Sequence, residues 1–174
     1  GMLKKNLILL LIILGFQFNV VAQSNNETFT IYLVRHSEKD LTSSNYSDPH
    51  LTDCGEQRSK SLSNFLIDVD LDIVYSTDYN RTKNTALPTA VSKGLDVKEY
   101  NAQELEVFSK LIMDRKQDAL VVGHSNTTGV LAGLLVGEDL GEFDLDIYDR
   151  IYQVVVYKGT GRLHLLHSVF DCGN

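Results

Sequence analysis

The sequence is poor in proline, cysteine and tryptophan: its 174 residues include two Pro, two Cys and no Trp. Two prolines exclude a proline-rich linker or a collagen-like chain, and two cysteines are too few for a disulfide-dense small domain. Basic residues are also in the minority, with 16 Lys and Arg against 23 Asp and Glu. An acidic chain without long basic runs lacks the charge to hold nucleic-acid phosphates, so we expect no nucleic-acid partner.

The longest hydrophobic run lies at the N-terminus. It spans residues 7–18, follows Lys4 and Lys5, and leads to the small residue Ala22. This order is typical of a secretory signal peptide, and the run is short for a membrane span of about 20 apolar residues. We expect residues 1–22 to be a cleaved signal peptide, and the mature protein to be periplasmic or secreted without stable membrane association.

The remaining residues, 23–174, form one predicted domain, because they contain no repeat and no linker. Gly1, which precedes Met2, is interpreted as a remnant of cloning. Cys54 and Cys172 are far apart and lack metal-ligand spacing. In an oxidising compartment they can form one disulfide that ties down the C-terminus. The alternative is two unpaired thiols, and the sequence does not choose between them.

Short apolar runs alternate with amphipathic segments along this domain. Runs rich in β-branched and aromatic residues predict strands, and apolar residues three or four apart predict helices. We expect strands at residues 29–34, 72–75, 97–100, 119–122, 151–157 and 163–170, and helices at residues 52–68, 80–93, 102–116 and 126–136.

Three local features refine these elements. Thr52 is placed to cap the first helix, with Leu62, Phe65 and Leu66 on its buried face. Pro88 is expected to kink or divide the second helix. Residues 158–161, Lys-Gly-Thr-Gly, predict a hairpin turn between the last two strands.

The alternation of strands and helices predicts an α/β fold. We expect a three-layer sandwich, in which helices cover both faces of a mostly parallel sheet and an antiparallel hairpin lies near the C-terminus.

Histidine and arginine residues follow three of the predicted strands. Arg35 and His36 come directly after the first, His124 follows the fourth, and Arg81 lies shortly after the second. Sites in open α/β sheets form beyond the carboxyl ends of strands. If these strands are neighbours, the four side chains converge on one pocket. Two arginines suit an anionic tetrahedral group, and a neutral imidazole is a competent nucleophile toward phosphorus.

Four segments in this order resemble the motifs of the histidine phosphatase superfamily, which has the phosphoglycerate-mutase-like fold. Residues 33–39 resemble its Arg-His-Gly motif and residues 51–55 its Leu-Thr-x-x-Gly helix start. Residues 76–86 resemble the segment with its second arginine, and residues 122–127 the segment with its second histidine. The compact size is similar to that of the small phosphohistidine phosphatases.

The resemblance implies a phosphatase of the histidine acid phosphatase type that needs no metal or cofactor. It implies that His36 becomes phosphorylated while Arg35, Arg81 and His124 hold the phosphoryl group, with Ser125 as a further substrate-binding residue. The partner it implies is a small phosphorylated substrate; the oligomeric state is not predicted.

The proton donor of the reaction is less clearly marked in the sequence. In the superfamily an acidic residue normally follows the third strand, where this chain has Glu99 and Glu104. Glu104 is the preferred candidate, because it lies beyond the strand near the start of the next helix.

Three other functions remain open from the sequence. The pocket can bind phosphate or a phosphorylated ligand without catalysis. Residues 123–127 nearly reproduce the G-x-S-x-G motif of serine hydrolases, with Ser125 as the nucleophile. Asp48, His50 and His124 can serve as ligands in a metallophosphatase, although they lack the compact spacing of known metal motifs.

Overall fold

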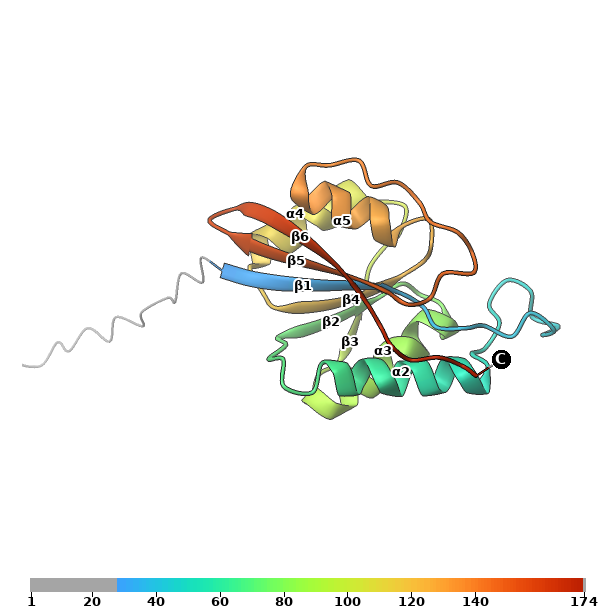
Figure 1. Cartoon of the computed structure of the whole chain (residues 1–174). Coiled ribbons are helices and arrows are strands. Elements are labelled where there is room, and N and C mark those ends of the chain that lie inside the picture. Colours follow the sequence, from blue (N-terminus) through green and yellow to red (C-terminus); the bar gives the residue numbers. More distant parts are fainter. Residues whose placement is uncertain (1–27, 174) are drawn as a thin grey trace, which may run out of the picture.

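A single six-stranded sheet forms the centre of the protein (Figure 1). The computed structural model describes residues 28–173. The strands are β1 (Thr28–Arg35), β2 (Ile73–Ser76), β3 (Val97–Glu99), β4 (Ala119–Gly123), β5 (Arg150–Tyr157) and β6 (Thr160–His167), in the order β3-β2-β4-β1-β5-β6. The first four in that order pair in parallel, and β5 and β6 add an antiparallel edge.

Within residues 28–173, four helices cover the two faces of the sheet: α2 (Asp53–Phe65), α3 (Asn80–Lys93), α4 (Leu105–Arg115) and α5 (Thr128–Val136). Figure 1 shows α4 and α5 on one side and α2 and α3 on the other. Alternate residues of β1 serve both cores, because successive side chains of a strand point to opposite faces. Ile31 and Leu33 pack in the core under α4 and α5, and Tyr32 and Val34 in the core over α2 and α3. The predicted three-layer α/β fold is confirmed.

Several predicted boundaries were wrong by a few residues. The first helix ends at Phe65 rather than residue 68, α4 begins at Leu105 rather than residue 102, and α5 begins at Thr128 rather than residue 126. Phe65 is 48% exposed, so its prediction as a buried residue was also wrong. Phe65 is the last residue of the helix, and the next residue, Leu66, is the one that is fully buried in the core.

Pro88 does not divide the second helix, since α3 runs through it from Asn80 to Lys93. The helix ends at Gly94, whose φ of 65° is the left-handed conformation that glycine adopts at little cost. At the predicted hairpin, Tyr157 pairs directly with Thr160, so the turn consists of Lys158 and Gly159. Both have positive φ, which matches the right-handed twist of the two strands.

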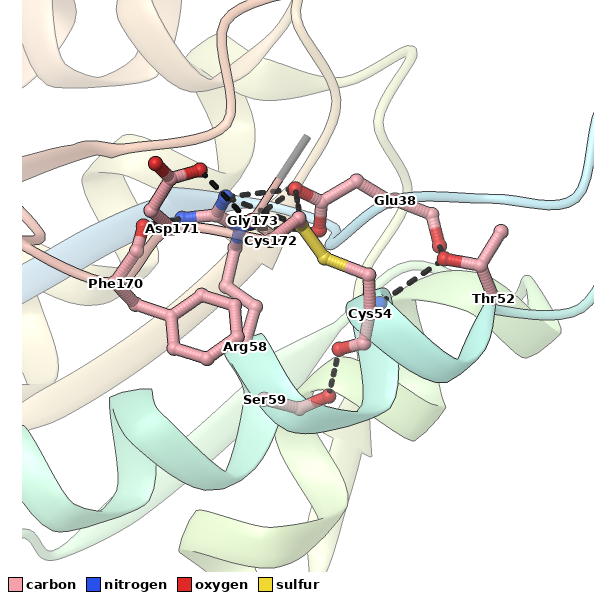
Figure 2. The surroundings of a disulfide bond; sticks show 10 residues. Glu38, Thr52, Cys54, Arg58, Ser59, Phe170, Asp171, Cys172 and Gly173 are labelled. Atoms are coloured by element: carbon pink, nitrogen blue, oxygen red, sulfur yellow. Dashed lines mark hydrogen bonds and ion pairs between the residues drawn. A yellow bond between two sulfur atoms is a disulfide. The ribbon is translucent and has the colours of Figure 1, made fainter.

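A disulfide joins Cys54, in the first turn of α2, to Cys172 near the C-terminus (Figure 2). Their Cα atoms are 5.6 Å apart, although 118 residues separate them in sequence. Of the two alternatives that the sequence left open, the structure therefore has the disulfide and not two unpaired thiols. The predicted signal peptide, residues 1–22, lies outside the described residues. Within residues 28–173, no helix has the length and apolar character that crossing a bilayer requires.

Thr52 caps α2 as predicted, because its Oγ1 accepts a hydrogen bond of 3.0 Å from the backbone N–H of Gly55. We expect Thr52→Ala to lower the free energy of unfolding by about 1 kcal/mol, since an N–H at the helix start then loses its partner. Thr52→Ser keeps the hydroxyl and is the matched control. Urea unfolding of the three proteins measures the effect, and an alanine variant as stable as the serine variant would contradict it.

Candidate active site

Three neighbouring strands end at one side of the sheet and bring the predicted residues together. In the parallel pairs, Arg35 of β1 lies opposite Gly123 of β4, and Ser76 of β2 lies opposite Val122 of β4. Beyond these ends is a cavity of about 650 Å³. Its lining includes Arg35, His36, Arg81, His124 and Ser125. The convergence expected from the sequence is therefore present.

His36 is held in one orientation by two hydrogen bonds. Its backbone N–H donates to the carbonyl oxygen of Gly123 at 2.9 Å, and its Nδ1 lies 2.7 Å from the carbonyl oxygen of Ser37. Because a carbonyl oxygen only accepts, Nδ1 must carry the proton. In a neutral ring the lone pair is then on Nε2, the nitrogen available as a nucleophile.

The surroundings of His36 keep its ring neutral. Burial lowers its pKa to about 3 and is the largest cause. The positive charges of Arg35, His124 and Arg81 lower the pKa further, whereas the hydrogen bond to the Ser37 carbonyl opposes them. At neutral pH the imidazole is therefore uncharged, as a nucleophile must be.

His124 is the second imidazole of the cavity, with its ring centre 5.6 Å from that of His36. Its Nε2 lies 2.9 Å from Oγ1 of Thr77, which itself donates to Oγ1 of Thr82. Since the hydroxyl proton of Thr77 is used in that way, Nε2 of His124 is the donor in their bond. Burial, followed by the charge of Arg81, lowers the pKa of His124 to about 4.

Arg35 is 5% exposed and is held by backbone carbonyls rather than by a carboxylate. Its Nη1 donates to the carbonyl oxygens of Leu145 and Ile147, at 2.7 and 3.0 Å. The guanidinium carbon lies 4.0 Å from the ring centre of Tyr148, a cation–π contact. Neutral partners of this kind fix the position of the arginine, and among residues 28–173 no carboxylate forms an ion pair with it.

Arg81 approaches the cavity from the first turn of α3. It donates to the carbonyl oxygen of Ser47, lies 3.5 Å from a carboxylate oxygen of Asp48, and packs over the ring of Tyr79. The Nε atoms of Arg35 and Arg81 are both buried without a hydrogen-bond partner among residues 28–173. Two arginine side chains on the wall of one cavity favour an oxyanion as the ligand, because guanidinium groups form strong charge-assisted bonds with oxyanions.

The sequence analysis missed several residues of the cavity. Lys39 lines it, and burial together with the charges of Arg81 and Arg35 lowers the pKa of its amine. Glu142 and Asp144 supply carboxylates from the connection between α5 and β5. Lys39 could have been predicted from the sequence, because it belongs to the motif at residues 33–39. The connection between α5 and β5 has no periodicity or motif that would have marked Glu142 and Asp144.

Glu104, the predicted proton donor, does not line this cavity. Because α4 begins at Leu105, the cavity is lined at this point by Ala102 and Gln103, while Glu104 is exposed and lines a separate hollow with Glu99. Glu99 is paired with Lys83 at 2.7 Å. The structure does not bring either carboxylate to the four central residues, so the donor role of Glu104 has no geometric support.

The residues of the two alternative enzymes are not assembled either. Ser125 lines the cavity, but among the described residues no histidine is hydrogen-bonded to its hydroxyl. Asp48 accepts hydrogen bonds from the backbone and side chain of Asn80 at the start of α3, and His50 is exposed in the loop. Asp48, His50 and His124 do not form a group with metal-ligand spacing.

Within residues 28–173, the acid and thiol side chains that do have such spacing are Glu38, Cys54 and Cys172. The two sulfur atoms are joined as a disulfide, and the Glu38 carboxylate is paired with Arg58. These contacts occupy the groups that a metal ion would need.

The model of the histidine phosphatase superfamily (branch 1) matches residues 31–104. The match contains Arg35, His36 and Arg81, and the fold brings His124 beside them. Over these residues the chain is similar to the histidine phosphatase superfamily. No curated protein matches it in sequence.

Several solved structures share the fold of this chain at low sequence identity. The protein histidine phosphatase SixA, complexed with tungstate, is 17% identical with a TM-score of 0.67, over 80% of this chain and 97% of that one. The α-ribazole phosphatase from Shigella flexneri is 16% identical with a TM-score of 0.67, over 84% and 100%. The phosphoglycerate mutase from Bacillus anthracis str. Sterne is 16% identical with a TM-score of 0.60, over 80% and 92%.

The lowered pKa values of the two histidines predict their titration in the ligand-free protein. We expect NMR midpoints close to pH 3 for His36 and pH 4 for His124, because burial disfavours the charged ring. Both rings then stay neutral as the pH falls through the ordinary histidine value of about 6.5. The spectra of His36→Gln and His124→Asn assign the signals, and a midpoint near the ordinary value for either ring would contradict the prediction.

Proposed function

We propose that the protein is a phosphatase that hydrolyses phosphomonoesters through a phosphohistidine intermediate on His36. The observation that carries this proposal is the neutral His36 ring, with its lone pair on Nε2, in a cavity that Arg35 and Arg81 also line. A nucleophile and an oxyanion site in one cavity are the two components that phosphoryl transfer needs.

In the first step, Nε2 of His36 attacks phosphorus, and the bond between phosphorus and the leaving oxygen breaks. The negative charge on the other phosphoryl oxygens is stabilised by Arg35 and Arg81, whose positions are already fixed by carbonyl groups and aromatic rings. His124 and Ser125 line the same cavity and are proposed as further contacts of the phosphoryl group. The positive charges come from the protein itself, so the proposed reaction needs no metal.

In the second step, water attacks the phosphohistidine and releases inorganic phosphate, and Nε2 of His36 regains its lone pair. The hydrogen bond from Nδ1 to the Ser37 carbonyl supports both steps, because it stabilises the positive charge that the ring acquires during attack. SixA, whose fold the chain shares, is complexed with tungstate, another tetrahedral oxyanion. We expect tungstate and inorganic phosphate to compete with the substrate here.

The proposed substrate is a small phosphorylated molecule, met in the periplasm or outside the cell after removal of residues 1–22. The disulfide between Cys54 and Cys172 supports export, because disulfides persist in oxidising compartments. Cell fractionation, with detection of the mature N-terminus by mass spectrometry, tests this location.

A second candidate function is binding of phosphate or a phosphorylated ligand without turnover. The positive charges of Arg35 and Arg81 on the cavity wall favour an oxyanion equally in that case. The two functions differ in the role of His36, which only the catalytic proposal needs as a nucleophile.

We expect His36→Ala to lower kcat/KM on an aryl phosphate by at least about 1,000-fold, because no other group forms the covalent intermediate. Release of phosphate, assayed with EDTA present, measures the loss. The matched control is His50→Ala, an exposed histidine outside the cavity, which should keep nearly the wild-type rate. A folded His36→Ala protein with near-normal turnover would refute the mechanism, and phosphate binding with no turnover in the wild type would favour the second function.

Because Glu104 lies outside the cavity, we expect its removal not to change how kcat/KM depends on the leaving group. A general acid typically contributes about 100- to 10,000-fold, and most where the leaving oxygen is basic. We expect Glu104→Gln and Glu99→Gln to leave the ratio of kcat/KM for alkyl and aryl phosphates unchanged, because neither residue lines the cavity. If Glu104→Gln slows alkyl esters much more than aryl esters, Glu104 is the donor after all.

A further inference from the structure

The C-terminal tail of the protein lies beside the loop that carries the nucleophile. Residues 168–173 follow β6 and run to the start of α2, where the disulfide joins Cys172 to Cys54 (Figure 2). None of these residues lines the active-site cavity. The tail instead reaches the site through Glu38, which is two positions after His36.

Arg58 of α2 connects Glu38 to the tail. Its Nε donates to both carboxylate oxygens of Glu38, at 2.9 and 3.0 Å, and its Nη2 donates to Oε1 at 2.7 Å. Its Nη1 donates to the carbonyl oxygen of Phe170 at 3.1 Å, and the guanidinium packs over the Phe170 ring. The two charged side chains are only 13% and 19% exposed. Charge-assisted bonds with this geometry fix direction as well as distance, so the tail helps to orient the Glu38 carboxylate.

The disulfide holds the tail against the same carboxylate. Sγ of Cys172 lies 3.3 Å from Oε1 of Glu38 and 3.9 Å from Nη2 of Arg58. Because Cys172 is covalently joined to Cys54 in the first turn of α2, the tail cannot leave this position while the bond exists. Without the bond, noncovalent contacts such as those of Arg58 would have to hold the chain end.

Glu38 also has a fixed backbone. Its carbonyl oxygen accepts hydrogen bonds from the backbone N–H and the hydroxyl of Thr52, at 2.9 and 3.4 Å. A methyl group at Gly55 would overlap that oxygen, which explains the glycine at this place in the motif. The next residue, Lys39, forms a bridge with Leu51 and lines the cavity. Glu38 is therefore followed directly by a residue of the cavity wall.

We infer that Glu38 is a positioning residue for the segment Arg35–Lys39, and that the disulfide-anchored tail keeps it in place. Phosphate binding and turnover then depend on whether Cys54 and Cys172 are joined. The inference rests on the proposed phosphatase function. A dithiol reductant converts the disulfide into two thiols with two electrons and two protons, and is itself oxidised to a cyclic disulfide. The tail then separates from Glu38, and Lys39 and His36 lose their alignment with the phosphoryl group.

The test compares the oxidised protein, the dithiothreitol-reduced protein and Cys172→Ser, well below their unfolding temperatures. The readouts are the Kd of inorganic phosphate from calorimetry, and kcat and KM on p-nitrophenyl phosphate. We expect the Kd to rise about threefold or more and kcat/KM to fall about 10-fold in the reduced protein and in Cys172→Ser, since small displacements of catalytic groups are costly. The double variant Cys54→Ser/Cys172→Ser should not respond to dithiothreitol, which shows that the reductant acts through this disulfide.

Glu38→Gln separates positioning from stabilisation. With the disulfide intact by thiol titration, it should reproduce the change in Kd and kcat/KM, because the amide cannot form the same charged pair with Arg58. The matched control is Glu56→Gln, which changes an exposed acid in the first turn of α2. It should leave the Kd, kcat and KM unchanged.

Two outcomes distinguish failure of this inference from failure of the proposed function. If the oxidised protein hydrolyses phosphomonoesters, and reduction or Glu38→Gln lowers only the unfolding temperature, the disulfide is purely stabilising and the inference is wrong. If the oxidised protein binds phosphate but hydrolyses none, the proposed function fails. In that case the Kd of phosphate alone tests whether Glu38 is a positioning residue. An unchanged Kd after reduction would overturn this inference.

Discussion

The parallel pairing of β2, β4 and β1 is the constraint on which the site depends. Parallel strands that are neighbours end on the same side of a sheet, so residues just beyond their carboxyl ends become neighbours too. The pairing of Arg35 with Gly123 places His36 beside His124, and the backbone hydrogen bond from His36 to Gly123 extends that register by one residue. A different strand order would leave the same residues at separate edges of the sheet.

The chemistry of the cavity follows from how its charges are held. Arg35 is oriented by carbonyl oxygens and an aromatic ring, and Arg81 by a carbonyl, an aromatic ring and one carboxylate 3.5 Å away. Burying such cations is costly unless a partner compensates them. Among the described residues, the Nε atoms of both arginines are buried without a partner, and both side chains line the cavity in which an oxyanion would compensate their charge. The same positive field, added to burial, keeps His36 neutral and able to attack.

Two segments distant in sequence complete this arrangement. The connection between α5 and β5 supplies the carbonyls and the tyrosine that hold Arg35, together with Glu142 and Asp144 on the cavity wall. The C-terminal tail reaches Glu38 by way of the disulfide and Arg58. The end of β1 and the loop that follows it are thus contacted by two segments from the C-terminal part of the sequence.

The sequence by itself determined the layered α/β fold and four central residues, because hydrophobic periodicity and strand-end positions are local patterns. Arg35, His36, Arg81 and His124 follow strands that are recognisable from short runs of residues. Only the tertiary structure decided the partners of these residues. Tyr148 and Leu145 come from a segment without a motif, and Glu104, at the start of α4, is exposed and does not line the cavity. Such contacts depend on how segments far apart in the sequence pack against one another in space. A local sequence pattern carries no information about that packing.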